Sequence, residues 1–386
     1  MLPNPTLHLS GERFAVLYRM TASSEAEVRE KAFGVAVEQT IEFPYEIAPA
    51  VIQETIVGRI ESIEPGAEKE RLSAGPGAWL VRISYAVESS GFELTQLLNV
   101  IFGNSSIKPG IRVERLELPD AILGHFKGPR FGRQGLRERL GVTGRPLLCT
   151  ALKPMGLSAS DLAQLAYQFA LGGIDIIKDD HGLADQPFSP FVDRVARCAE
   201  AVERANRETG RKSIYMPNVT APADRLQRYA RKARELGAGG LLVAPGLAGF
   251  DAMRALADDD EISLPIMSHP AFLGSFVTSP ENGISHYALF GQICRLAGAD
   301  ATVYPNWGGR FSFSKEECAS IAEGSAASMG HLKPIFPAPG GGMSLERVPE
   351  MHEVYGHEVI FLIGGGLFKS GPDLVQNCRN FLQMIS

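Results

Sequence analysis

Lysine, carboxylate and imidazole side chains follow short apolar runs at three places in the chain. Lys153 follows the run 147–152, the sequence Lys178-Asp179-Asp180-His181 ends a second run, and His269 ends a third. A lysine next to buried apolar residues loses hydration of its ammonium group, so its pKa falls toward values suited to proton abstraction. The competing interpretation is a solvated lysine at the end of a strand.

The cluster 178–181 sets a stricter condition, because four consecutive ionisable residues cannot all be buried without pairing with one another or with a cation. In an extended strand alternate side chains share a face, which puts Lys178 and Asp180 on the same side. A metal site and a salt-bridge network both satisfy this pattern. A single histidine such as His269 is more often a hydrogen-bonded structural residue than a catalyst.

Glycine-rich segments follow three further apolar runs. Two are the triplets 340–342 and 364–366, each just before a helix-like stretch, and the third is the loop 304–310, which ends in Arg310. Glycines at a helix N-terminus let backbone N–H groups approach an anion. Two triplets at corresponding positions therefore predict a phosphate site, whereas the loop 304–310 is equally compatible with a simple connection.

These residues belong to a repeating pattern in which strand-like and helix-like stretches alternate eight times from Leu147 onward. The strand-like runs are apolar on both faces, as buried parallel strands are. Their number and length predict a (β/α)8 barrel, with an open doubly wound sheet as the rival, and a barrel gathers its active site at the C-terminal ends of its strands. The runs are 147–152, 174–180, 213–219, 240–246, 264–270, 301–306, 333–339 and 359–365.

The first part of the chain mixes strands and helices without a parallel repeat. We expect strands over 13–20 and 79–87 and helices over 24–39 and 93–103, which together predict a small α+β domain of ferredoxin-like type. The expected division is residues 1–135 for this domain and 136–386 for the barrel, with the segment 124–144, rich in glycine and arginine, as the linker. Capping boxes at Ser158-x-x-Asp161 and Ser314-x-x-Glu317 predict two helix starts within the barrel.

Composition excludes several classes of protein. The net charge of -6, from 38 basic and 44 acidic residues, argues against non-specific binding to nucleic acid. No apolar run reaches the roughly 18 residues that span a bilayer, and the N-terminus lacks the pattern of a secretory signal. The five cysteines are scattered and lack metal or redox spacing. We therefore expect a cytoplasmic protein without a nucleic-acid or membrane partner.

The order of motifs resembles the RuBisCO large-subunit superfamily, from about residue 13 to residue 366. The barrel motifs are T-x-x-K-P at 150–154, GGIDIIKDDH at 172–181, QPFSPFVDR at 186–194, His269 and the triplet 364–366. The N-terminal motifs are RFAVLYRM, AFGVAVEQT, LLNVIFGN and HFKGPRFG.

The resemblance implies a role for each matching position. Lys153 would handle the α-proton of the substrate, and His269 would take part in proton transfer. Lys178 would form a carbamate that binds Mg²⁺ together with Asp180 and His181. Phosphate or substrate contacts are expected from Thr150, Arg310, Gly340, Gly341, Gly364 and Gly365. Glu38 and Asn104 would be lent to the site of a partner subunit, which implies a homodimer; no small subunit is expected.

Departures from the family pattern bear on the substrate. His181 replaces a glutamate, and imidazole is a poorer ligand for Mg²⁺ than carboxylate, so the metal's identity and the carbamylation of Lys178 stay open. Further polar ligands are lost: Met155 replaces a lysine, Pro270 an arginine, Leu273 a histidine and Phe43 a threonine, while Arg310 stands approximately where a lysine is expected. One end of a bisphosphate site is thereby weakened, which predicts a substrate with one phosphate.

The predicted function is metal-assisted enolisation of a phosphorylated sugar by an isomerase or tautomerase of methylthio-ketose phosphates. The first alternative is a decarboxylase of a branched 3-oxo sugar-acid phosphate, which would form the same enolate by loss of carbon dioxide. The second is a non-catalytic protein that binds phosphate ligands. A productive ribulose-bisphosphate carboxylase is disfavoured by the departures from the family pattern.

Overall fold

The computed structural model describes residues 3, 5–66, 77–311, 313–341 and 345–385, and the chain divides into two compact units. Unit 1 comprises Met1–Phe126, Leu273–Gln292 and Ser328–Leu332, and unit 2 comprises Lys127–Phe272, Ile293–Ala327 and Lys333–Ser386. The division predicted at residues 135 and 136 is coarser than this grouping and stays a prediction. None of the described helices is long and apolar enough to cross a membrane.

Unit 1 is an α+β fold built on a five-stranded sheet with the order β10-β4-β1-β3-β2. β1 pairs antiparallel with both β3 and β4, and β3 with β2, which gives the ferredoxin-like order expected from the sequence. The short strand β10 extends the sheet by pairing parallel to β4, although it belongs to a segment that follows the barrel strand β9. The elements are β1 (Arg13–Thr21), α1 (Glu25–Glu38), α2 (Ala50–Thr55), β2 (Arg59–Pro65), β3 (Ala78–Ala86), α4 (Leu94–Phe102), β4 (Ile111–Glu117), α5 (Asp120–Leu123), α12 (Gly274–Val277) and β10 (Gly283–Ile284).

His286, two residues after the end of β10, makes the stability of the protein depend on pH. It is 3% exposed, and burial together with Arg112 lowers its pKa to about 3. Because an unfolded histidine has a pKa of about 6.5, the unfolded chain binds a proton below that pH which the folded chain does not. Stability is therefore lost as pH falls, and we expect this residue to lower the free energy of unfolding by about 2 kcal/mol between pH 7 and pH 5.

Urea denaturation of the wild type and of His286→Gln at both pH values measures this contribution. The variant should show a smaller loss of stability on going from pH 7 to pH 5. An equal loss in the two proteins would mean that His286 is protonated in the folded state.

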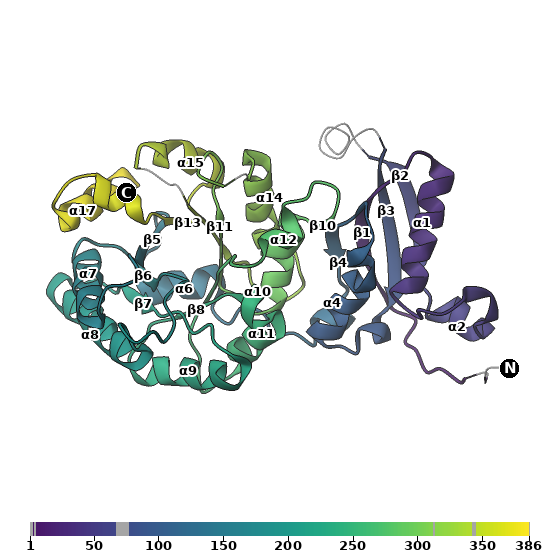
Figure 1. Cartoon of the computed structure of the whole chain (residues 1–386), viewed down its shortest axis with the longest axis horizontal. Coiled ribbons are helices and arrows are strands. Elements are labelled where there is room, and N and C mark those ends of the chain that lie inside the picture. The colour runs from purple at the N-terminus through teal and green to yellow at the C-terminus, as the bar shows by residue number, and fades with distance from the viewer. Residues whose placement is uncertain (1–2, 4, 67–76, 312, 342–344, 386) are drawn as a thin grey trace. The chain divides into compact units, whose positions relative to one another are not determined.

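Unit 2 is a (β/α)8 barrel. Its described strands form two parallel four-stranded sheets, ordered β13-β5-β6-β7 and β12-β11-β9-β8. A parallel bridge between Asn218 and Leu242 joins β7 to β8, and β12 lies against β13, so the sheet closes (Figure 1). The strands are β5 (Leu147–Leu152), β6 (Ile176–Asp179), β7 (Ile214–Met216), β8 (Leu241–Val243), β9 (Ile266–Ser268), β11 (Ala301–Pro305), β12 (Phe336–Gly340) and β13 (Ile360–Leu362).

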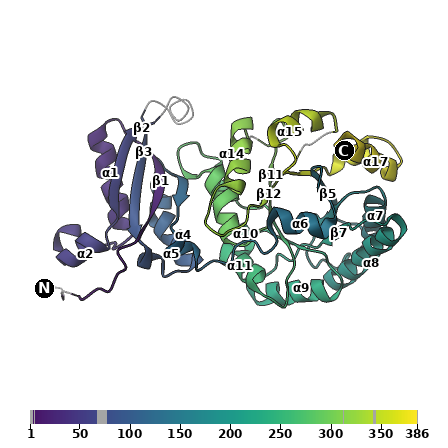
Figure 2. The ribbon, with the colours of Figure 1, turned by 180° about the vertical axis from the view of Figure 1, so that it is seen from behind.

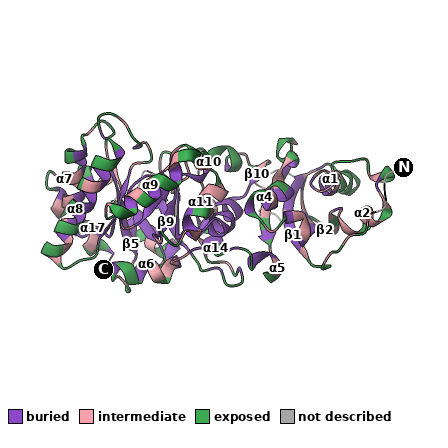
Figure 3. Cartoon of the chain, turned by 90° about the horizontal axis from the view of Figure 1, so that it is seen from below, coloured by how far each residue is buried: buried purple, intermediate pink, exposed green. Residues whose placement is uncertain are grey.

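The long helices of unit 2 cover the barrel and bury one face each, as α8 and α9 do. Figure 3 shows the strands β5 and β9 buried and much of the outer surface of α8 and α9 exposed. Ser158 and Ser314 cap α7 and α14 through the predicted capping boxes. The helices are α6 (Gly132–Leu140), α7 (Ala159–Leu171), α8 (Phe191–Thr209), α9 (Ala223–Glu235), α10 (Pro245–Ala248), α11 (Phe250–Asp258), α13 (Cys294–Leu296), α14 (Lys315–Ala326), α15 (Val348–Tyr355), α16 (Gly365–Lys369) and α17 (Leu374–Met384).

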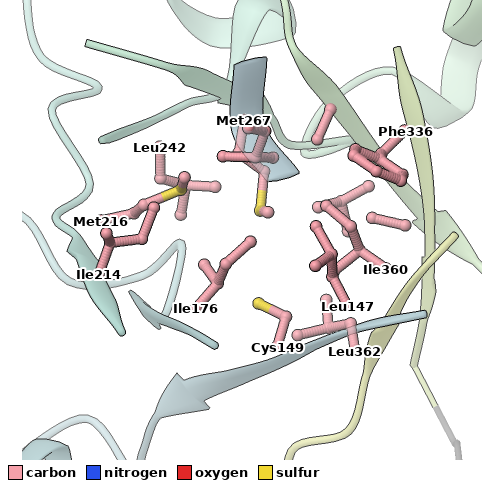
Figure 4. Close-up of a cluster of buried hydrophobic side chains, with 14 of the residues drawn as sticks. Leu147, Cys149, Ile176, Ile214, Met216, Leu242, Met267, Phe336, Ile360 and Leu362 are labelled. Atoms are coloured by element: carbon pink, nitrogen blue, oxygen red, sulfur yellow. The ribbon is translucent and has the colours of Figure 1, made fainter. Parts of the chain in front are cut away.

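The interior of the barrel is filled by apolar side chains from successive strands (Figure 4). Ile176, Met216, Leu242 and Met267 are members of this core, each at most 1% exposed. All five cysteines are free and buried, as expected of thiols that act as small hydrophobes.

The predicted linker is too long: the chain passes from unit 1 to unit 2 after Phe126, within the segment 124–144, but the middle of that segment forms α6 (Figure 2). Leu136 and Leu140 of this helix belong to the barrel core, and the carboxylate of Asp300 accepts hydrogen bonds from the N–H groups of Phe131 and Gly132 at 2.8 and 2.7 Å. Glycine and arginine give this helix little apolar pattern. Its two buried leucines lie four residues apart, which is the spacing of one helix face, and this spacing could have predicted the helix despite the composition of the segment.

Candidate active site

The strand β6 presents its charged residues on alternate sides. Ile176 lies in the barrel core, so Lys178, two residues later, shares its face and enters the barrel. Lys178 is 2% exposed, and its Nζ donates to the carbonyl of Asp179 at 3.0 Å. Burial lowers the pKa of Lys178 from its ordinary value, because desolvation disfavours the ammonium form.

Asp180 links the ends of β5 and β6. Its Oδ1 lies 2.9 Å from Nζ of Lys153 and 3.4 Å from Nδ1 of His181. Burial alone would raise the pKa of Asp180, but the hydrogen bonds from His181 and Lys153 outweigh it and hold this pKa well below its ordinary value. Asp180 is therefore a carboxylate at neutral pH, with two cationic or hydrogen-bonding neighbours.

His269, at the end of β9, completes the cluster. Its ring stacks on that of His181, with centroids 4.3 Å apart and planes 14° from parallel. Burial and the neighbouring Lys178 and His181 lower its pKa to about 2, so the imidazole is neutral. Its Nδ1 accepts a hydrogen bond from the N–H of Ala271 at 3.1 Å, which leaves the ring hydrogen on Nε2.

The structure thus brings together five of the site residues predicted from the sequence, from the C-terminal ends of three strands. They are Lys153, Lys178, Asp180, His181 and His269. This cluster is referred to below as the lysine–histidine cluster.

Asp179 and its partners form a supporting network on the opposite side of β6 that sequence reasoning missed. Asp179 and Arg194 are both fully buried, and Nε of Arg194 lies 3.1 Å from Oδ2 of Asp179. Tyr215 donates its hydroxyl to the same carboxylate at 2.7 Å, and the N–H of Asn218 does so at 3.0 Å. Arg194 also donates to the carbonyl of Ala184 at 2.7 Å, which fixes the loop after β6. Nothing in the spacing of QPFSPFVDR predicts this pairing, since Asp179 and Arg194 meet only when α8 packs on β6.

The glycine segments lie at the ends of β12 and β13. Gly364 is the N-cap of α16, and a Cβ built on Gly364 or Gly365 would meet no atom within 4 Å. This open space beside backbone N–H groups leaves room for a phosphate. Gly341, at a φ of +75°, lies against the ring of Phe311, while Gly342 falls outside the described residues.

Four other predicted residues stand apart from the lysine–histidine cluster. Glu38 and Asn104 meet in unit 1, where the amide of Asn104 donates to Oε1 of Glu38 at 3.1 Å. Arg310 is exposed, with its guanidinium 5.0 Å from the centre of the Phe311 ring. Thr150 is buried and follows the core residue Cys149 in β5, so its side chain faces away from the barrel interior.

The donor set for a metal is incomplete in unmodified side chains. Within the described residues no group of three His, Cys, Asp or Glu side chains is arranged to hold a metal ion. Asp180 and His181 offer two donors, and the third would have to come from Lys178, whose amine becomes an oxygen donor only as a carbamate. Such a set of carboxylate, carbamate and imidazole fits a divalent ion, with imidazole as its softest member.

Residues 132–371 match the family model of the ribulose bisphosphate carboxylase large chain, catalytic domain. The chain belongs to this family. Within it, the chain is 38% identical to the 5-methylthioribulose-1-phosphate isomerase of Rhodospirillum rubrum, covering 97% of this chain and 96% of that protein. It is 35% identical to the 2,3-diketo-5-methylthiopentyl-1-phosphate enolase of Geobacillus kaustophilus, covering 92% and 87%.

The crystal structure of a RuBisCO-like protein from Rhodopseudomonas palustris superposes with a TM-score of 0.86 at 38% identity, covering 97% of each chain. The chain is therefore an enzyme of the RuBisCO-like group. The α+β domain and barrel expected from the sequence are confirmed.

Proposed function

We propose that this RuBisCO-like enzyme catalyses enolisation of a phosphorylated methylthio-ketose, as an isomerase or tautomerase. The observation that carries the proposal is the lysine–histidine cluster, in which Lys153, Asp180 and a neutral His269 surround one point at the mouth of the barrel. The names of the relatives support the same substrate class.

The proposed roles follow from the contacts. Lys153 takes the proton from the carbon next to the substrate's carbonyl. His269 carries its hydrogen on Nε2 and donates it to the developing enolate oxygen. A divalent metal ion held by Asp180, His181 and carbamylated Lys178 would polarise the same carbonyl.

Substrate binding is assigned to the glycine segments. Gly364 and Gly365 donate their N–H groups to the single phosphate, assisted by Gly340 and Gly341. Arg310 remains a predicted contact, whereas Thr150 is assigned none, because its side chain faces away from the barrel interior. Glu38 and Asn104, already hydrogen-bonded to each other, would be supplied by the partner subunit of a homodimer.

Proton NMR in D2O tests the proposal. The enzyme, with Mg²⁺ and bicarbonate, is given methylthioribulose 1-phosphate, 2,3-diketo-5-methylthiopentyl 1-phosphate and a branched 3-oxo-acid phosphate. We expect deuterium uptake next to the carbonyl of a methylthio substrate, with loss of activity when EDTA removes the metal. Carbon dioxide release from the branched acid alone would instead identify a decarboxylase. No exchange with any of them, while they still bind, would contradict enolisation.

A further inference from the structure

A second hollow lies on unit 2, at the end of the barrel away from the lysine–histidine cluster. It has a volume of about 650 Å³, and its walls come from the end of α6, the second half of α8 and the loops that lead into β7 and β8. Parallel barrel strands all run in one direction, so the N-terminal ends of β7 and β8 lie opposite the face where β5, β6 and β9 end. None of the residues assigned to the proposed reaction lines this cavity.

Positive charge is concentrated around this cavity, although the whole chain carries a net charge of -6. Its lining has one acidic side chain, Glu203, which pairs with Arg207 at 3.5 Å. The other cationic residues of the lining are Arg139, Arg211 and Lys212. Within the described part of the chain, none of these three forms an ion pair with a carboxylate. Three unneutralised cations therefore face one hollow.

Helix ends explain only part of this charge. Arg139 and Arg207 lie in the last turns of α6 and α8, where the partial negative charge of the helix dipole favours cations. Arg211 and Lys212 lie beyond Gly210, which caps α8, and so outside either helix. The dipole of a helix end amounts to about half an elementary charge, so two helix ends do not neutralise this group.

Packing against neighbouring glycines restricts the side chains of Arg211 and Lys212. The side chain of Lys212 crosses the end of α6, since a Cβ built on Gly141 would lie 3.6 Å from its Cδ. The guanidinium carbon of Arg211 lies 3.2 Å from the position of a Cβ on Gly173. The stem of Lys212 and the guanidinium of Arg211 thus each lie against a glycine, which reduces the entropy lost when a ligand orders these side chains.

We propose that this cavity binds a small molecule with two or more phosphate groups, as a site separate from the active site. Arginine matches phosphate oxygens through paired N–H donors, and lysine adds a point charge. The rest of the lining mixes the apolar side chains of Ala199, Val202 and Ile214 with the polar side chains of Asn206, Ser213 and Tyr215. The volume lies within the roughly 300–1,000 Å³ of small-molecule sites. A ligand with a single phosphate would leave part of the cationic group unpaired.

Isothermal titration calorimetry of the full chain with pyrophosphate tests the site. The variant Arg211→Gln/Lys212→Gln removes two lining cations, and the control Arg197→Gln/Arg228→Gln removes two exposed cations of α8 and α9 outside the lining. We expect the dissociation constant to rise by about tenfold or more in the first variant and to stay within about twofold in the control. Inorganic phosphate should bind the wild type about tenfold more weakly than pyrophosphate.

Three results would overturn the proposal. The first is the absence of pyrophosphate binding. The second is equal affinity of the cavity variant and the control for pyrophosphate, which would place the ligand at the glycine segments instead. The third is equal affinity for phosphate and pyrophosphate. Thermal unfolding without ligand checks that both variants are folded, and Arg139→Gln offers an independent test of the same lining.

Discussion

Replacing Lys153 by methionine is expected to lower the rate of deuterium exchange by a factor of about 10² to 10⁴. Methionine keeps the apolar stem of the side chain but has no amine to accept a proton. It also removes the ion pair with Asp180, in which the two atoms lie 2.9 Å apart. The lysine side chain is 38% exposed, so the change should affect the reaction far more than the stability of the barrel. Proton NMR in D2O, with the better of the two methylthio substrates, measures the exchange.

The matched control is Lys232→Met on the outer surface of α9, which removes an exposed lysine paired with Glu235. We expect its exchange rate to equal that of the wild type. If Lys153→Met also turned over substrate at the wild-type rate, Lys153 would not be the base. If the Lys153→Met variant and the wild type treated the ligands alike, binding them without any lysine-dependent turnover, the result would favour the non-catalytic alternative.

The second large effect concerns stability. The Arg194→Met variant is expected to lose about 3–5 kcal/mol of unfolding free energy, because it leaves the carboxylate of Asp179 buried without its counter-ion. Both partners are fully buried in the native protein, and burial already raises the pKa of Asp179. Urea denaturation followed by circular dichroism measures the loss.

Two companion variants separate charge from packing. Arg197→Met lies on the same helix and breaks an exposed pair with Asp193, so it should cost less than about 1 kcal/mol. The double variant Asp179→Asn/Arg194→Met removes both charges. The new amide oxygen can still accept from the N–H of Asn218, and the amide nitrogen can donate to the hydroxyl oxygen of Tyr215. The double variant should therefore be more stable than Arg194→Met alone. A double variant that is less stable than Arg194→Met would show that the unpaired charge is not the cause.

Local sequence signals predicted the elements of the barrel well. The runs that became β5 and β11 were located within a residue, because apolar stretches bounded by polar residues persist in a buried parallel sheet. The capping boxes at Ser158 and Ser314 were also predicted correctly, because a capping box depends only on two residues three positions apart in the sequence. The helix α6 was missed because its glycines and arginines resemble a linker, and only contact with the barrel core stabilises it.

Within the candidate site, the sequence showed which residues could do chemistry, but it did not show which residues they contact. The strand-end positions of Lys153, Asp180 and His269 were read from the sequence, and closure of the barrel brings these residues together. The pairing of Asp180 with Lys153, the stacking of His269 on His181 and the burial that keeps His269 neutral follow from distances between different strands.

By itself, the sequence determined the barrel strands and their order, the lysines, carboxylate and histidines at strand ends, and the family. Those features are local in the chain or preserved as ordered motifs. Only the tertiary structure decided that Asp179 turns away to a buried Arg194, that Thr150 faces away from the barrel interior, and that Arg139, Arg211 and Lys212 line one cavity. Such contacts join residues distant in sequence, and closure of the barrel, rather than any local preference, brings them together.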